Sequence, residues 1–135
     1  MSISDLPTLS VLRTKMQWHE ARQRLLSENV ANSDTPNFRP RDLVEPKFDS
    51  TGATTGTTGA LPLARTSTGH IASADGGDAS FDKNRKVGFE TRPAGNAVSL
   101  EEEMMKVSAN QMDFAAVTQL YSKSLQLIKI AIGKG

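Results

Sequence analysis

The first apolar residues of the chain recur with the alternating three- and four-residue spacing of one helix face. The row consists of Leu9, Leu12, Met16, His19, Gln23, Leu26 and Val30, and Leu6 extends it backwards. Repeats of seven residues are typical of a helix that packs lengthwise against another helix. A second row at Val11, Trp18 and Leu25 widens the face, so we expect this helix to contact more than one neighbour.

The ends of this first helix carry recognisable signals. Ser4 or Asp5 is the expected N-cap, and Pro7 suits the first turn, where its missing N–H costs nothing. After residue 28, Asn, Ser and Asp side chains compete for the backbone, and Pro36 disfavours the α conformation of the residue before it. The sequence therefore predicts one helix and a polar turn within residues 1–35.

An apolar row with the same spacing runs unbroken through the last third of the chain. It consists of Leu100, Met104, Val107, Gln111, Phe114, Thr118, Tyr121, Leu125, Ile128 and Ile132. A second row that widens the face consists of Val117, Leu120, Ser124, Leu127 and Ala131. Ser99 and Glu102 have the Ser-x-x-Glu spacing of a capping box, and Gly133 is the expected helix end. We expect a second long helix within residues 99–135.

The segment between the helices has the composition of a linker, since 16 of the 30 residues at 51–80 are Gly, Thr or Ser. Such a segment buries too little apolar area to offset the entropy of ordering it, so we expect it to be flexible. The apolar groups that could pair there as brief strands are Leu61 with Leu63, Ile71, and Val87 with Phe89. The expected fold is mainly α: two long terminal helices packed as an antiparallel-type coiled coil, joined by a flexible middle at residues 36–98.

The strongly apolar residues are concentrated at the two ends of the chain. Leu, Ile, Val and Phe number 29 of 135, but residues 47–97 hold only 7 of them. An enzyme core that holds distant catalytic groups is therefore not expected. Two wide apolar helix faces with little between them instead require other chains to cover them.

Charge and cysteine content exclude further classes of function. The formal net charge is +1 without a basic stripe, which argues against a nucleic-acid-binding protein. The chain has no cysteine, so disulfides and thiolate metal sites are excluded. The first ten residues lack the features of a secretory signal and no apolar run could span a membrane, so we expect a soluble, uncleaved chain.

Few residues could carry chemistry. His19 and His70 are the only histidines and lie in different segments, so we expect packing or surface roles, and neither a metal nor a cofactor. The glycines at 52–59 lack the Gly-Lys-Ser/Thr of a phosphate loop and fit a spacer. A hydrolase built on His70 with Asp75 or Asp78 would lack any known motif.

Two groups in the second helix have ordinary structural explanations. The glutamates at 101–103 suit the positive end of the helix dipole as solvated carboxylates. Met104, Met105 and Met112 stand at helical spacing and are expected to fill a core. Methionine also suits a packing site whose neighbours vary, and this second explanation stays open.

The most specific stretch is the junction after the first helix, Asn29-Val30-Ala31-Asn32-Ser33-Asp34-Thr35-Pro36-Asn37-Phe38. Asn side chains can bond the freed helix carbonyls and can take left-handed conformations, so we expect a fixed turn that returns Phe38 to the helix. Through Asn29, Asn32, Thr35 and Pro36 the stretch resembles the amino-terminal signature of the axial proteins of the bacterial flagellum. Asn37 replaces the usual Gly of that signature, and Phe38 replaces the usual Tyr. Arg41-Asp42 resembles the Ala-Arg-Asp that often follows.

A second set of residues in the carboxyl-terminal third also carries a resemblance. They are Asn96, Val98, Leu100, Glu101, Glu103, Met104, Asn110, Gln111, Phe114, Leu120, Leu127, Lys129, Ala131, Ile132 and Gly133. Through them the chain resembles one branch of the axial proteins, the FlgB family of rod proteins. The sibling FlgC family usually has an Arg-x-Tyr element where this chain has Gln111 to Phe114, and it stands as the near alternative.

The resemblance implies a structural subunit of the proximal rod of the flagellar basal body, and no enzyme. Such a subunit assembles by helix packing into a tube that transmits torque and lets exported proteins pass. It reaches the periplasm without a cleaved signal peptide. The implied partners are further copies, FlgC, FlgF, FlgG, the rod adaptor FliE, the export gate and the MS ring, without nucleic acid or membrane insertion. The signature residues and the two apolar rows are then the expected assembly interface.

A different class of function also fits the residues taken alone. Amphipathic helices can lie on a lipid surface or in the groove of a partner protein. The balanced charge of the second helix argues against the lipid surface.

Overall fold

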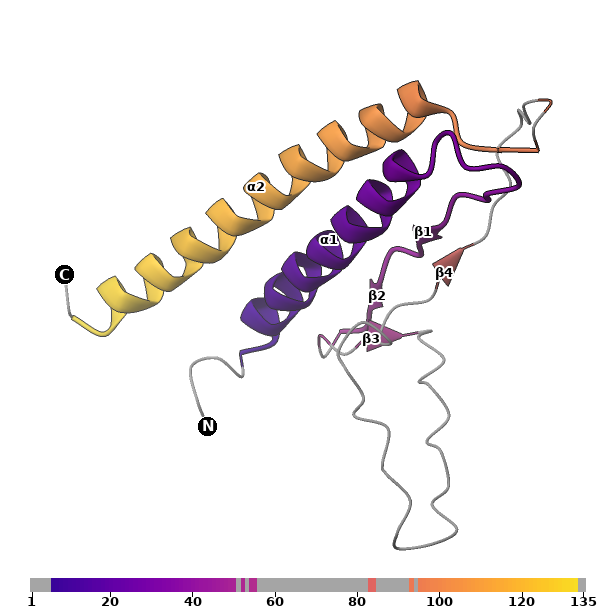
Figure 1. Ribbon diagram of the computed structural model, residues 1–135. Helices are drawn as coiled ribbons and strands as arrows, with labels where there is room; N and C mark the ends of the chain where they lie inside the picture. The colour runs from indigo at the N-terminus through magenta and orange to yellow at the C-terminus, as the bar shows by residue number, and fades with distance from the viewer. Residues whose placement is uncertain are drawn as a thin grey trace, which may run out of the picture.

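Two long helices dominate the computed structural model, which describes residues 6–50, 52, 54–55, 83–84, 93 and 95–133. Helix α1 spans Pro7–Ala31 and helix α2 spans Leu100–Ala131. The helices lie side by side and run in opposite directions (Figure 1). The predicted fold, mainly α with two long helices packed against each other, is confirmed.

Four strands of two residues each lie in the described residues. Strand β1 (Asp42–Leu43) pairs antiparallel with β4 (Lys83–Asn84), so that the first residue of β1 is opposite the last of β4. Strand β2 (Lys47–Phe48) pairs antiparallel with β3 (Thr54–Thr55) in the same manner. The positions at which the sequence suggested brief strands lie outside the described residues, namely Leu61, Leu63, Ile71, Val87 and Phe89.

The start of α1 differs in detail from the prediction. Leu6 is the N-cap, in place of Ser4 or Asp5, and no side-chain hydrogen bond caps the helix. Pro7 occupies the first turn as predicted. The rigid φ of proline, which already suits the first helical turn, thus defines this start without help from a capping side chain.

The ends of α2 lie where the sequence placed them, but the predicted capping box does not form. Ser99 is the N-cap, yet its side chain makes no capping hydrogen bond. Its backbone carbonyl accepts the N–H of Glu103 at 3.0 Å. Gly133, with φ of 79°, follows the last turn as predicted, because glycine takes this left-handed conformation without a steric penalty.

Helix α1 is covered on two sides, as its two apolar rows predict. In the first row Leu9 and Leu26 are fully buried. In the second row Trp18 and Leu25 pack against Leu43 of β1. The contact is fixed by a hydrogen bond from the indole N–H of Trp18 to the carbonyl oxygen of Val44, at 2.8 Å.

A charged pair reinforces this second contact. Nε and Nη2 of Arg22 each donate to one carboxylate oxygen of Asp42, both at 2.8 Å, and the guanidinium lies 5.2 Å from the centre of the Trp18 ring. The hydrogen bonds to Asp42 raise the pKa of Arg22 despite its partial burial. The segment after α1 is therefore attached to the helix by both apolar and ionic contacts.

Candidate assembly interface

The junction after α1 folds as the fixed turn that the sequence predicts. The side-chain amide of Asn32 donates to the freed carbonyl of Glu28 at 2.8 Å, and the Thr35 hydroxyl donates to Oδ1 of Asn32 at 3.1 Å. Asn37 has φ of 60°, a left-handed conformation. This is the position at which the axial-protein signature usually has Gly. Phe38 is half-buried, whereas Pro36 is exposed.

Asn96, just before α2, holds this turn from the opposite end of the chain. It is 3% exposed, and its Nδ2 donates to the carbonyls of Asn32 at 2.9 Å and Thr35 at 2.6 Å. Next to it, the N–H of Ala97 donates to the carbonyl of Phe38 at 3.1 Å. The turn is therefore one structure made by two segments far apart in sequence.

Asn29 joins three segments at the end of α1. It is 1% exposed, and its Nδ2 donates to the Arg41 carbonyl at 2.7 Å and to Oε2 of Glu103 at 2.8 Å. Its Oδ1 accepts the backbone N–H of Arg41 at 3.1 Å. Arg41 also forms an ion pair with Glu28. The first signature Asn thus binds α1, the returning segment and α2 together.

Glu103 is not the solvated carboxylate that its place in an acidic run suggested. It is 2% exposed, and besides Asn29 it accepts a hydrogen bond from Lys106 at 2.8 Å. Burial lowers the pKa of Lys106, but the hydrogen bonds to Glu103 and Glu102 raise it by more, so the pKa lies above its ordinary value. Hydropathy alone could not identify this inward-facing carboxylate.

A second buried polar contact lies near the middle of the helix pair. His19 of α1 is 6% exposed and Asn110 of α2 is 2% exposed, and Nδ1 of His19 lies 2.7 Å from Oδ1 of Asn110. The amide nitrogen of Asn110 donates to Oε1 of Gln23 at 3.0 Å. The packing role expected for His19 is therefore combined with a hydrogen bond to α2.

Part of the row predicted along α2 faces α1, and part does not. The buried or half-buried residues along the inner side are Glu103, Val107, Asn110, Phe114, Val117, Tyr121, Ser124 and Ile128. Thr118 is half-buried as well. The members of the predicted row that are exposed are Leu100, Met104, Gln111, Leu125 and Ile132. On α1, by contrast, Leu12 and Met16 are half-buried and Leu26 is fully buried.

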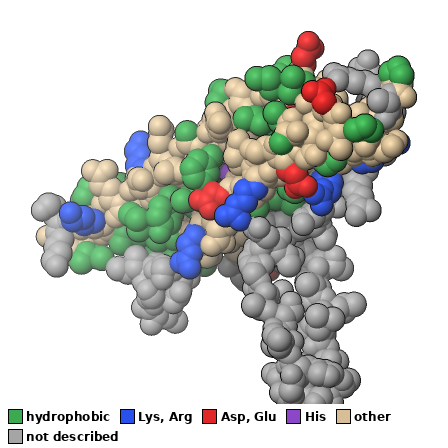
Figure 2. Space-filling model, in the orientation of Figure 1, with side chains coloured by type: hydrophobic (Ala, Val, Ile, Leu, Met, Phe, Trp, Pro, Cys, Tyr) green, Lys and Arg blue, Asp and Glu red, His purple; other side chains and the backbone are tan. Residues whose placement is uncertain are grey.

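Helix α2 exposes large hydrophobic side chains along its whole length. They are Leu100, Met104, Met105, Met112, Leu120, Leu125, Leu127, Ile130 and Ile132, each between 39% and 71% exposed. Figure 2 shows hydrophobic side chains gathered on the visible face over α2, with charged groups scattered among them. The prediction that Met104, Met105 and Met112 fill the core of this chain is wrong, because all three point to solvent.

A shallow groove of about 590 Å³ lies between the two helices. Its lining consists of His19, Glu20, Gln23, Arg24, Ser27, Asn110, Gln111 and Phe114. Within the described residues, no group of three or more metal-ligating side chains could hold an ion, and neither helix is long and apolar enough to cross a membrane. His70, Asp75 and Asp78, the basis of the hydrolase alternative, lie outside the described part of the chain.

No protein-family model matches the sequence. Five curated relatives are each named flagellar basal body rod protein FlgB. The relative from Proteus mirabilis strain HI4320 is 29% identical over 117 residues, which cover 84% of this chain and 85% of that protein. The relative from Yersinia enterocolitica is 31% identical over 97 residues, 69% of either chain. The relative from Bacillus subtilis strain 168 is 21% identical over 137 residues, 95% of either chain.

These relatives confirm the resemblance that the Asn-rich junction and the second helix indicated, and their shared name supports FlgB over FlgC. The similarity extends over most of the sequence and includes both helices in the Bacillus subtilis relative. The chain belongs to the FlgB family of flagellar basal body rod proteins.

Proposed function

We propose that this chain is a structural subunit of the proximal rod of the flagellar basal body and has no enzymatic activity. The observation that carries the proposal is the length of exposed apolar surface on α2 in a member of a rod protein family. A helix that is apolar on several sides but covered on one requires further neighbours.

In this proposal, subunits dock side by side through heterologous contacts, which generate an open helical tube. Closely packed helices transmit torque because packed interiors deform little. The lumen of the tube lets export substrates pass. The subunit reaches the periplasm through the export channel without a cleaved signal peptide. Its neighbours are further copies, FlgC, FlgF, FlgG, FliE, the export gate and the MS ring.

The predicted interface residues divide into two roles under this proposal. Those between the helices and in the turn keep the helix pair in one shape. Those that α1 leaves exposed on α2 contact the neighbouring subunits, and they are Leu100, Met104, Gln111, Leu125 and Ile132. The division explains why one seven-residue pattern serves both the fold and the assembly.

Deletion of the gene in the source bacterium tests the proposal. We expect cells without a rod and without swimming, restored by the intact gene, and we expect the chain in purified basal bodies by mass spectrometry. A pair of variants separates assembly from folding. Ile132→Lys on the exposed side should block rod formation without changing the helix content, whereas the control Lys129→Arg should change neither rod formation nor helix content. Normal rods in the deletion strain would contradict the proposal.

A further inference from the structure

The outer side of α2 carries a row of four residues whose charges are opposite to those they would meet on a second copy of the row running in the opposite direction. Glu102, Ala109, Ala116 and Lys123 stand seven residues apart, so they follow nearly one line along the helix. All four are exposed. We call them the outer row. Read in either direction, it consists of one charged residue, two alanines and the opposite charge.

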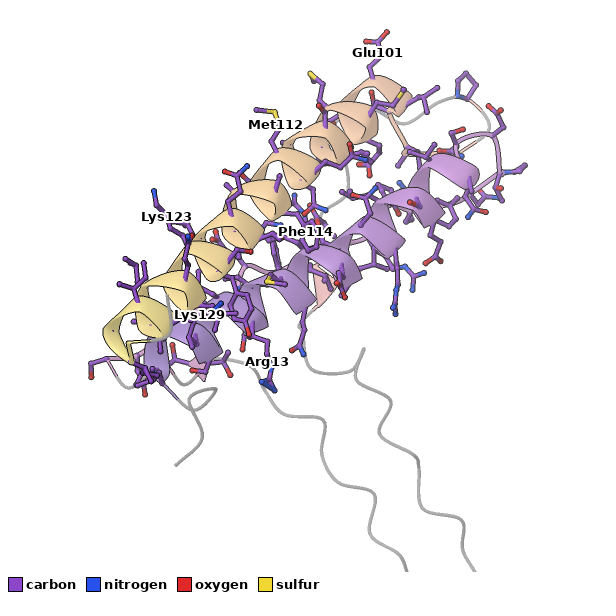
Figure 3. All side chains as sticks on the ribbon, turned by 90° about the vertical axis from the view of Figure 1, so that its left-hand side faces the viewer. Arg13, Glu101, Met112, Phe114, Lys123 and Lys129 are labelled. Atoms are coloured by element: carbon purple, nitrogen blue, oxygen red, sulfur yellow. The ribbon has the colours of Figure 1, made fainter. Side chains whose placement is uncertain are left out.

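Large apolar side chains flank the outer row, on one side of its first half and on the other side of its second half. They are Met105, Met112, Leu120 and Leu127, which are 67%, 71%, 55% and 63% exposed. Figure 3 shows Met112 and Lys123 projecting from the side of α2 away from α1, whereas Phe114 lies toward α1. The outer row and these four apolar side chains together are called the strip, which at about 1.5 Å per residue extends over roughly 33 Å of the helix.

We propose that two copies of the free chain pair through this strip, with their α2 helices antiparallel. Antiparallel pairing sets Glu102 of each copy opposite Lys123 of the other, and Ala109 opposite Ala116. Parallel pairing would set glutamate beside glutamate and lysine beside lysine, which repel each other. The alanines at the centre let the two backbones approach, and the bordering methionine and leucine side chains then cover them.

The charges of the outer row are free to make this contact at little cost. Glu102 accepts from Lys106 of its own helix at 2.9 Å, but its side chain is 54% exposed, and an exposed pair of this kind contributes little to stability. Lys123 has no ion-pair partner among the residues that the structure describes. Glu102 of a second copy therefore pairs with Lys123 without breaking a strong contact.

The pairing goes beyond the proposed function, because it concerns the chain before assembly. Subunits in a tube built from heterologous contacts all point the same way, whereas an antiparallel pair has a two-fold axis. The second copy covers the apolar strip of the free chain and has to leave before rod neighbours take its place. A rod subunit that is monomeric when free would overturn this inference and leave the proposed function intact.

Cysteine crosslinking tests the orientation without background, because the natural chain has no cysteine. We expect a disulfide-linked dimer when full-length Ala109→Cys and Ala116→Cys variants are mixed and oxidised, at a yield several-fold above that of either variant alone. Parallel pairing gives the opposite result, in which each variant links to itself. That result, or the absence of a link in the mixture, would overturn the proposal.

Charge reversal tests the contact itself by sedimentation of the full chain. Glu102→Lys or Lys123→Glu places like charges at both ends of the pair, so each should raise the dissociation constant at least about tenfold. The double variant should return it to within a few-fold of the natural value. Lys129→Glu makes the same charge change as Lys123→Glu, but at a position outside the outer row, and serves as the control. A monomeric natural chain, or a double variant as weak as the single ones, would refute the pairing.

Discussion

Asn110 of α2 accepts a hydrogen bond from His19 of α1 at 2.7 Å, in the buried interface between the two helices. The amide nitrogen of Asn110 already donates to the His19 carbonyl and to Gln23, both at 3.0 Å. Its oxygen is therefore the acceptor, and Nδ1 of His19 carries the hydrogen. Polar groups at such core positions favour one register of the helices, because a shift would leave them without partners.

Asn110→Ala removes the acceptor and leaves the His19 N–H buried without a partner. We expect the free energy of unfolding to fall by about 1–3 kcal/mol, measured by urea denaturation at fixed protein concentration. Gln111→Ala, one position along on an exposed site, should change it by less than about 0.5 kcal/mol. Equal losses in the two variants would contradict the inward position of Asn110.

Gly95→Ala should destabilise the turn by about the cost of its positive φ. Gly95 has φ of 78°, and the atom nearest to an added Cβ is Oδ1 of Asn37. This oxygen ends an exposed side chain that can turn away, so the overlap adds little. Gly133 has nearly the same φ with nothing within 4 Å, so Gly133→Ala isolates the conformational cost of about 1–2 kcal/mol. Thermal unfolding should show similar losses in the two variants, and a several-fold larger loss for Gly95→Ala would contradict the freedom of the Asn37 side chain.

Phe114→Ala and Leu125→Ala separate the fold from the assembly. Phe114 is half-buried against α1, so its loss should reduce the stability of the free chain by about 2 kcal/mol. Leu125 is 39% exposed, and its loss should cost less than about 1 kcal/mol. Both variants should still impair rod formation in the source bacterium. Normal rods with Leu125→Ala would exclude this side chain from the proposed subunit contact.

The raised pKa of Lys106 predicts that the folded chain loses stability at high pH. Its pKa is raised above the ordinary 10.5 in the folded chain, so its ion pairs stabilise the fold fully below that pH. The contribution declines as the pH rises through the raised pKa, because the folded lysine then loses its proton. Lys106→Met has no such titration, so the difference in unfolding free energy between the two proteins should shrink above about pH 10.5. A constant difference would contradict the ion pairs.

The sequence located the helices well because their signals are local. Pro7 and Gly133 mark ends that need no tertiary contact. The row on α1 was also predicted correctly, since its apolar residues are confined to the covered sides. On α2 apolar residues occur all round the helix, so spacing alone could not decide which side faces α1.

Buried polar residues account for the main errors at the candidate interface. Glu103 and Asn110 lie in the inner row of α2, yet their residue types indicate solvent. Asn96 was noted only as part of a family resemblance, and its two hydrogen bonds to distant backbone depend on the folded turn. Such roles depend on a partner far away in sequence, which composition and periodicity do not reveal.

The hydrogen bond between Ala97 and Phe38 brings the two ends of the intervening sequence to one place. The entropic cost of closing a flexible loop grows only with the logarithm of its length, by about 0.6 kcal/mol for each doubling. Insertions or deletions within residues 56–82, away from the residues that contact α1 and within the part of the chain that the sequence predicts to be mostly a linker, should therefore change the stability of the helix pair very little. Evolution or protein engineering could alter the length of this segment independently of the two helices, which makes it a suitable place to insert a reporter peptide.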